Sequence, residues 1–239
     1  MGKPFGFRGH LQVRVRDLGL TYRAGSTPVF DRISHAFSPG SLTLLAGPSG
    51  SGKSTLLYVL GLMLTPSYGH VMWNSHVVSM ASDAERARLR ARHVGFVFQD
   101  ALLDLSRTAA ENIEEAAWLA GLDKRQAVAT ALELLDRFGV AHRADHRPGE
   151  ISGGQAQRIA LCRALVKQPA LILADEPTGN LDEGTAQLVW DTLAQEAADG
   201  VTVIVATHDA RWLRQGRTVL ELTGRPLPTG GKSEVDGLR

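Results

Sequence analysis

The stretch "SLTLLAGPSGSGKST", residues 41–55, joins a continuous apolar run to a glycine-rich loop. The apolar run is typical of a strand that is buried on both faces. The loop, residues 47–55, matches the pattern G-x-x-x-x-G-K-[ST], and a helix is expected to follow from Lys53 to about Leu64. A strand before this pattern and a helix after it form the context in which it binds nucleotide phosphates. The stretch therefore predicts an α/β fold with a phosphate site.

The loop offers backbone and side-chain groups to a nucleotide. Its glycines let the backbone wrap closely around a phosphate, and the N–H groups of the loop and of the helix start stabilise negative charge. Lys53 is expected to reach the β- and γ-phosphates, and the Ser54 hydroxyl to bind Mg²⁺. The predicted phosphate-binding residues are Gly47, Pro48, Ser49, Gly50, Ser51, Gly52, Lys53, Ser54 and Thr55. We expect ATP and Mg²⁺ as cofactors.

Further apolar runs predict the rest of an α/β core. Residues 93–99, 170–176 and 201–208 each suit a buried strand, and helical segments between such runs indicate a mostly parallel sheet. The first forty residues alternate polar and apolar, which predicts an antiparallel β subdomain with turns at Gly25 and Pro39–Gly40. Residues 100–165 are expected to form an inserted helical subdomain. We predict one domain over residues 1–225 and a loosely ordered tail over 226–239, which is rich in glycine and charge.

Composition excludes several classes of protein. The 239 residues carry a formal net charge of +1, which argues against nucleic acid as a partner. The one cysteine, Cys162, fits a reducing compartment. The chain has no run of 18 apolar residues, so no membrane-spanning segment is expected.

Polar side chains follow three of the predicted strands. Asp175 and Glu176 end the run at 170–176, where α/β sheets bind ligands. Asp175 would hold Mg²⁺, directly or through water, and Glu176 would activate the attacking water, unless the two merely cap a strand in solvent. Gln99 and His208 end two other runs. A histidine in such a place is more often structural, but the shared position favours one site for Gln99 and His208.

The segment "GEISGGQAQRIALCRAL", residues 149–165, predicts a helix with an unusual first turn. Ser152 and Gln155 form an S-x-x-Q capping box, which marks a helix start. Gly153 and Gly154 follow, although each glycine inside a helix costs about 1 kcal/mol relative to alanine. One explanation is tight packing of the helix against the subdomain.

Six motifs in order resemble those of the ATP-binding cassette (ABC) ATPases. They are the phosphate loop, Gln99, "ISGGQ", "LILADEP", "NLD" and His208, and the resemblance covers about residues 10–225. It implies that two ATPase subunits, identical or different, pack head to tail around two ATP molecules. Ser152, Gly153, Gly154 and Gln155 would then face the γ-phosphate held by the other subunit. Ile151 stands where leucine is usual in this family. On this reading the missing Cβ atoms allow N–H contact with the phosphate.

Other positions acquire roles through the same resemblance, Gln99 as a further metal ligand and His208 as a catalytic residue. Tyr22 looks like the aromatic residue that stacks on adenine, although a tyrosine in a β-hairpin can also be a core residue. Asp182 looks like the acid that links the two sites across the dimer. Leu102, Leu103 and Leu105 lie where these ATPases receive a helix from a membrane partner, and core packing is an equal alternative.

Within the family, "DEPTGNLD", "FVFQDALLDLSRTAAENI" and "HRADHRPGEISGGQ" look most like the branch of lipoprotein-releasing ATPases, macrolide and toxin exporters, and the cell-division ATPase. This implies an ATPase subunit on the cytoplasmic face of the membrane, attached through a separately encoded few-helix permease. Its work would be export or extracytoplasmic mechanotransmission. The alternative is a regulatory mechanotransmitter that moves no substrate. DNA-repair and translation ATPases usually carry two cassettes, a coiled-coil arm or zinc cysteines, none of which this sequence has.

Overall fold

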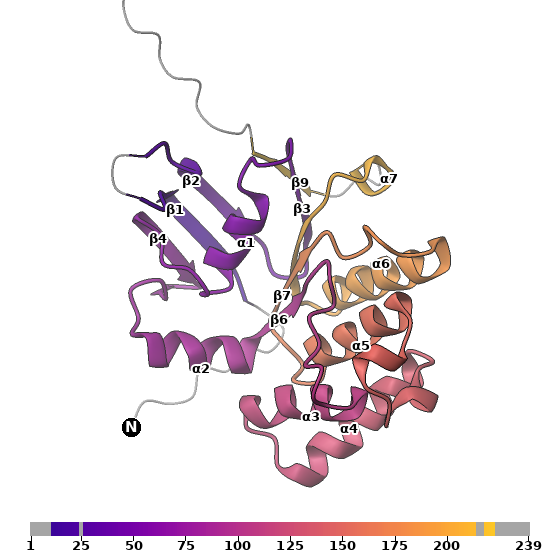
Figure 1. The fold of residues 1–239 in the computed structure, drawn as a ribbon. Coiled ribbons are helices and arrows are strands. Elements are labelled where there is room, and N and C mark those ends of the chain that lie inside the picture. Colours follow the sequence, from indigo (N-terminus) through magenta and orange to yellow (C-terminus); the bar gives the residue numbers. More distant parts are fainter. Residues whose placement is uncertain (1–10, 24–25, 214–217, 223–239) are drawn as a thin grey trace, which may run out of the picture.

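A parallel sheet runs through the middle of the molecule, and an antiparallel sheet lies to one side of it (Figure 1). The computed structural model describes residues 11–23, 26–213 and 218–222. The antiparallel sheet has the strand order β2-β1-β4-β5. Its strands are β1 (Val13–Leu20), β2 (Phe30–Phe37), β4 (Tyr68–Trp73) and β5 (His76–Val77). This sheet is the predicted N-terminal β subdomain.

The parallel sheet has the strand order β6-β7-β8-β3-β9. Its strands are β3 (Leu42–Ala46), β6 (Val94–Val97), β7 (Leu171–Asp175), β8 (Thr202–Ala206) and β9 (Thr218–Glu221). Alternate residues face two separate hydrophobic clusters: Ile172 joins the cluster with α3, α4 and α5, whereas Leu173 joins the cluster with the antiparallel sheet and α1. The sheet is therefore a wall between two cores. This explains why its strands are continuous apolar runs.

Helices surround the parallel sheet and extend beyond it. Their bounds are α1 (Lys53–Leu60), α2 (Asp83–His93), α3 (Ala109–Ala120), α4 (Lys124–Arg137), α5 (Gly153–Leu165), α6 (Glu183–Ala198) and α7 (Ala210–Leu213). Two short 3₁₀ helices, η1 (Ala141–Arg143) and η2 (Pro148–Glu150), lie between α4 and α5. In Figure 1, α3 and α4 form the end of the molecule farthest from β9. Among the described residues, no helix combines the length and apolarity needed to cross a membrane.

The predicted fold class is confirmed, but some details were wrong. Helix α1 ends at Leu60 and not near Leu64, because the chain turns at Gly61 and the next residue, Leu62, has φ +60°. Residues 100–108 form no helix, since the Asp104 side chain accepts the N–H of Ser106 and so competes with helical bonding. Strands β4, β5 and β9 were not predicted. The turn at Gly25 and the tail from residue 226 lie outside the described residues.

Candidate nucleotide site

The polar residues predicted for the site lie at one edge of the parallel sheet. Gln99 follows β6, Asp175 ends β7, His208 follows β8 and Gly47 follows β3. These four strands are neighbours and run in the same direction. Their carboxyl ends therefore share an edge, which is where open α/β sheets bind ligands.

The glycine-rich loop is shaped to hold an anion. Gly50 and Gly52 have φ of +76° and +93°, a conformation that glycine adopts without strain. The Lys53 ammonium donates to the carbonyl oxygens of Gly47 (2.9 Å) and Pro48 (3.0 Å), so its charge lies against the loop. Helix α1 starts at Lys53 with no side-chain cap on its first N–H groups. Uncapped N–H groups beside an ammonium group are the donors that a phosphate requires.

Ser54 and Asp175 meet next to this loop. The Ser54 hydroxyl donates to Oδ1 of Asp175 over 2.9 Å, and the Tyr58 hydroxyl lies 3.5 Å from Oδ2. Burial raises the pKa of Asp175 above its ordinary value, and the hydrogen bond from Ser54 partly opposes that rise. Mg²⁺ in nucleotide sites takes one or two protein oxygens together with phosphates and waters. A hydroxyl and a carboxylate beside the phosphate loop fit this ion.

Glu176 and His208 form a pair at the same edge. The Nδ1 atom of His208 lies 2.7 Å from Oε1 of Glu176. An ionised carboxylate can only accept, so His208 carries a proton on Nδ1 in this contact. Glu176 has φ +44°, a left-handed conformation that is uncommon outside glycine, and such strain clusters at functional sites.

The first turn of α5 has the predicted cap. The Ser152 hydroxyl accepts from the N–H of Gln155, and the Gln155 side chain accepts from the N–H of Ser152. A Cβ atom added to Gly153 would meet nothing within 4 Å, and one on Gly154 would make ordinary contacts with Thr185 (3.4 Å) and Asp182 (3.5 Å). Packing within the chain therefore does not require either glycine.

The α5 start faces a hollow of its own. A cavity of about 450 Å³ is lined by the residues from Ser152 to Gln155 and by Asp182, and the phosphate loop does not line it. Asp182 caps α6, and the N–H of Thr185 donates to Oδ1 of Asp182, which lowers the pKa of that carboxyl. The structure thus places Asp182 beside the first turn of α5, residues 152–155, which is called the glycine turn below.

Two other predicted residues lie at the surface. Tyr22 is 65% exposed and its hydroxyl is 3.3 Å from Oγ1 of Thr55, so it lies beside the phosphate loop and outside the core. Gln99 is also exposed, and its amide nitrogen lies beside Gly179, in the segment that follows Glu176.

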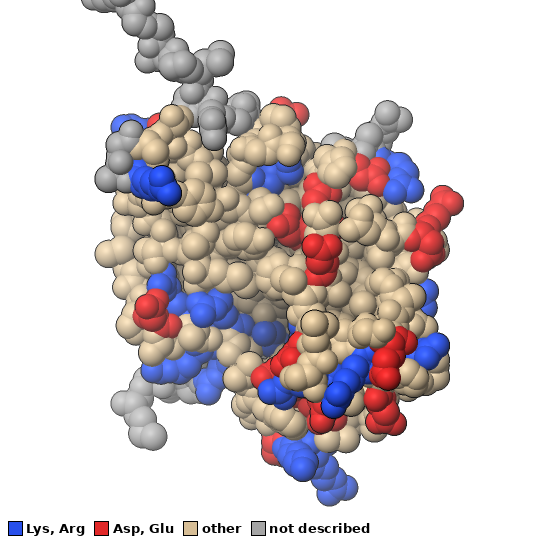
Figure 2. Space-filling model, viewed as in Figure 1, with Lys and Arg blue, Asp and Glu red and all other residues tan. Residues whose placement is uncertain are grey.

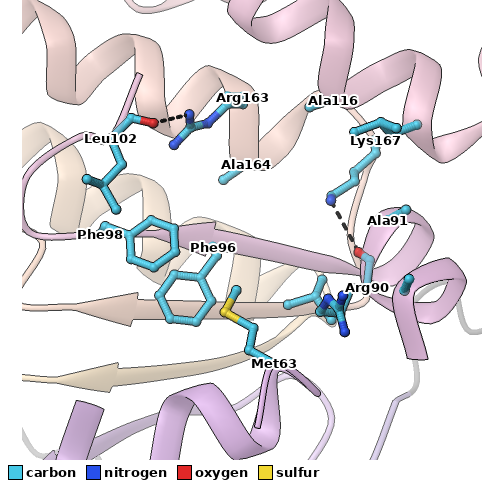
Figure 3. Close-up of a pocket in the computed structure, with 13 residues that line it drawn as sticks. Met63, Arg90, Ala91, Phe96, Phe98, Leu102, Ala116, Arg163, Ala164 and Lys167 are labelled. Carbon is cyan, nitrogen blue, oxygen red and sulfur yellow. Dashed lines mark hydrogen bonds between the residues drawn. The ribbon is translucent and has the colours of Figure 1, made fainter. Parts of the chain in front are cut away.

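The leucines after Gln99 divide between the two alternatives. Leu103 packs against the hydrophobic core, whereas Leu102 and Leu105 are exposed. Leu102 lines a groove of about 460 Å³ between α2, α3 and α5 (Figure 3). The apolar lining of this groove comes from Met63, Ala87, Ala91, Val94, Phe96, Phe98, Leu102, Ala116, Leu119 and Ala164, and its basic lining from Arg90, Arg163 and Lys167. Basic side chains also gather over the outer face of α2 (Figure 2).

Sequence reasoning missed two polar residues of α5. Gln157 is 2% exposed, and its amide donates to the carbonyl oxygens of Phe98 and Pro177. Arg163 donates to the carbonyl oxygens of Ala101 and Leu102. A signal was present for Gln157, because it stands one helical turn before the buried Leu161 on an apolar face.

In this parallel sheet a phosphate-binding loop follows β3, and Asp175 and Glu176 stand at the end of β7. These features define a P-loop ATPase. The ABC transporter family profile matches residues 30–179, and the chain belongs to this family. It is an ATP-binding ATPase subunit of an ABC transporter. The predicted family is thereby confirmed.

Individual relatives agree with this assignment. Two proteins named lipoprotein-releasing system ATP-binding protein LolD are similar to this chain. The one from Xanthomonas campestris pv. campestris is 41% identical over 225 residues, which cover 93% of this chain and 94% of that protein. The one from Myxococcus xanthus is 47% identical over 186 residues, covering 77% and 83%. They fall in the predicted lipoprotein-releasing branch.

A solved structure shares the fold. It is the dimeric post-hydrolysis state of the ATP-binding cassette MJ0796 bound to ADP and phosphate. The TM-score is 0.82 at 32% identity, and the match covers 88% of this chain and 94% of that one.

We expect Mg²⁺-dependent ATP binding to weaken on mild acidification. Burial raises the pKa of Asp175, so this carboxyl takes up its proton at a higher pH than an exposed aspartate, which titrates near about 4. The neutral acid is a poor Mg²⁺ ligand. Calorimetric ATP titrations with and without Mg²⁺ over a pH series measure the effect.

Asp175→Asn is the matched variant for this pH series. It should lower the Mg²⁺-dependent affinity at every pH and reduce its pH dependence to the part that the titrating phosphates of ATP contribute. The same pH dependence in the parent and in Asp175→Asn would remove Asp175 from the metal site.

Proposed function

We propose that two copies of this subunit, or one copy and a related subunit, close head to tail around two Mg²⁺–ATP. The glycine turn of α5 carries this proposal, because neither Gly153 nor Gly154 is required by packing inside the chain. Its hollow is not lined by the phosphate loop, so a second subunit is the natural source of the phosphate that it would bind. The similar solved structure is a dimer with ADP and phosphate bound, which supports this arrangement.

Each residue of the site then has a role in phosphoryl transfer. The loop residues 47–55 hold the phosphates, with Lys53 on the β- and γ-phosphates. Ser54, Asp175 and Gln99 hold Mg²⁺. Glu176 orients and deprotonates the attacking water, and His208, which touches Glu176, fixes its position and contacts the γ-phosphate. Tyr22 stacks on adenine beside Thr55, and Asp182 connects the glycine turn to the opposite site.

We further propose that the groove between α2, α3 and α5, called the partner groove from here on, receives a helix of an integral membrane permease. Its floor is apolar, and Leu102 and Leu119 lie on it largely exposed to solvent. None of the described residues that line it is acidic, and burial lowers the pKa of Lys167 to about 8. An amphipathic helix with apolar residues and a carboxylate complements this lining.

The names of the relatives favour transport over a purely regulatory role. Both carry the name of a lipoprotein-releasing system, so we infer that this subunit drives export of a lipid-modified substrate through its permease. The permease would hold it at the cytoplasmic face of the membrane. A mechanotransmitter of the cell-division type would use the same site, and no observation favours it here.

Hydrolysis should depend on Glu176 and nucleotide binding on Lys53. Glu176→Gln should keep ATP affinity and reduce turnover by about 10²-fold or more, because it removes the base and preserves the shape of the side chain. Lys53→Ala should weaken ATP binding itself. Fluorescent-nucleotide titration and steady-state phosphate release distinguish the two variants. Near-parental turnover in Glu176→Gln would exclude Glu176 as the base.

ATP-dependent dimerisation should depend on the open space at Gly153. Gly153→Asp places a carboxylate near the partner's triphosphate, and like charges about 4 Å apart repel by roughly 4 kcal/mol at an effective dielectric of 20. Gly153 is preferable to Gly154 for this test, since an aspartate at 154 would also face Asp182 of its own chain. Light scattering of the Glu176→Gln background with ATP should show a dimer that Gly153→Asp abolishes.

Gly149→Asp is the control for that experiment. Gly149 also has open space around it, but it does not line the hollow at the α5 start. It should dimerise like the parent. Dimerisation of Gly153→Asp at the same ATP concentration would contradict the cross-subunit model.

Membrane recruitment should depend on the partner groove. Leu119→Glu changes an exposed groove residue, and Leu132→Glu makes the same change at an exposed site on α4 outside it. Co-expressed with its permease, the parent and Leu132→Glu should sediment with membranes, whereas Leu119→Glu should remain in the supernatant. Equal sedimentation of both variants would place the permease contact elsewhere.

A further inference from the structure

We propose that Gln157, on α5, is a positioning residue for ATP hydrolysis. Its side chain ties Pro177, the residue after Glu176, to Phe98, the residue before Gln99. The inference rests on the proposed role of Glu176 in activating water. It adds a contribution from the interior of the helix whose first turn faces the partner subunit.

The contacts of Gln157 join three elements. Its Nε2 donates to the carbonyl oxygen of Phe98 over 3.0 Å and to that of Pro177 over 3.1 Å. Phe98 immediately precedes Gln99, and Pro177 immediately follows Glu176. Gln157 is 2% exposed, so water cannot easily replace these bonds. Removing a buried donor leaves its acceptors unsatisfied, which makes this amide a strong constraint on both segments.

The left-handed conformation of Glu176 requires such a constraint. Its φ of +44° is strained for a residue other than glycine, so neighbouring contacts must hold it. The N–H of Glu176 donates to Ala206, and its carbonyl accepts from Gly179. Pro177 has no N–H to anchor the segment further, and the bond from Gln157 to the Pro177 carbonyl fixes it instead. The strained turn brings the Glu176 carboxylate to His208.

Gln157 binds the start of the loop that runs from Phe98 to Leu102, and Arg163 binds its other end to α5. Arg163 donates to the carbonyl oxygens of Ala101 (2.8 Å) and Leu102 (2.7 Å), and Leu102 has φ +47°. Figure 3 shows Leu102 and Phe98 close together at one end of the groove. A helix that enters the groove therefore presses on a loop tied to α5 at both ends. Through Gln157, such a displacement reaches Pro177 and the carboxylate beside it.

Gln157→Met tests the proposal because methionine has similar length and no donor. We expect kcat to fall at least about tenfold while KM for ATP stays within about threefold, since the phosphate loop and Tyr22, which would bind ATP, lie on other elements. Asn112→Leu is the matched control. Asn112 is an equally buried amide on α3 that donates to the carbonyls of Asp104 and Thr108, away from the strand ends. It should lower the melting temperature and leave kcat unchanged.

Gln157→Glu supplies a second readout that a purely structural role would not give. The neutral acid retains one donor and the carboxylate retains none, and burial favours the neutral form. Its kcat relative to the parent should therefore rise as the pH falls from about 8 toward about 6. Melting temperatures measured over the same pH range separate this recovery from a change in folding.

The outcomes separate this proposal from the proposed function. If Gln157→Met melts lower but keeps parental kcat, as Asn112→Leu should, the positioning role of Gln157 is wrong, while loss of turnover in Glu176→Gln still supports the catalytic role of Glu176. If Glu176→Gln is as active as the parent, both proposals fail. A rise in KM without a fall in kcat would also overturn the role of Gln157, because it would indicate a contribution to ATP binding.

Discussion

The parallel alignment of β6, β7, β8 and β3 is the constraint on which the site depends. Each of these strands is buried on both faces, so a charged side chain inside them would lie in one of two cores, and the polar side chains that they do bury are threonines such as Thr202, whose hydroxyl donates to the Leu11 carbonyl oxygen. Chemistry is thereby confined to the residues at and just beyond the strand ends. Parallel pairing then brings Gln99, Asp175, His208 and the phosphate loop to one edge. A single sheet thus both separates the cores and assembles the site.

Helix α5 connects this edge to the rest of the molecule. Its first turn sacrifices helix propensity at Gly153 and Gly154, and the loss is offset by the capping box and by the buried residues that follow from Gln157 onward. Farther along, the same helix holds two strained residues of other segments, Leu102 directly and Glu176 through Pro177. The glycine turn, the groove-lining loop and the acidic edge therefore share one rigid support.

Local patterns predicted the elements whose stability is decided locally. The cap at Ser152 marked the start of α5, since a cap acts within one turn of its own residue, and Ser82, Thr108 and Asp123 cap three other helices in the same way. Strands β4 and β9 were missed because partners distant in the chain define them: β4 pairs with β1, and β9 pairs with β3 from the far end of the sequence. Residues 100–108, which belong to the predicted helical subdomain, form no helix because the Asp104 and Asn112 side chains bind their backbone.

The phosphate loop, the acids at the end of β7 and the glycine turn could be predicted from the sequence, because each is a short run whose chemistry depends on adjacent residues. The exposure of Leu102 and Leu105 and the packing of Leu103 could be seen only in the folded chain, since they depend on how the helical subdomain packs on the sheet. The hydrogen bonds of Gln157 could likewise be found only in the structure, because its partners lie 59 and 20 residues away in the sequence. Spacing along a chain fixes what a segment can do locally, whereas contacts between distant segments exist only once the chain has folded.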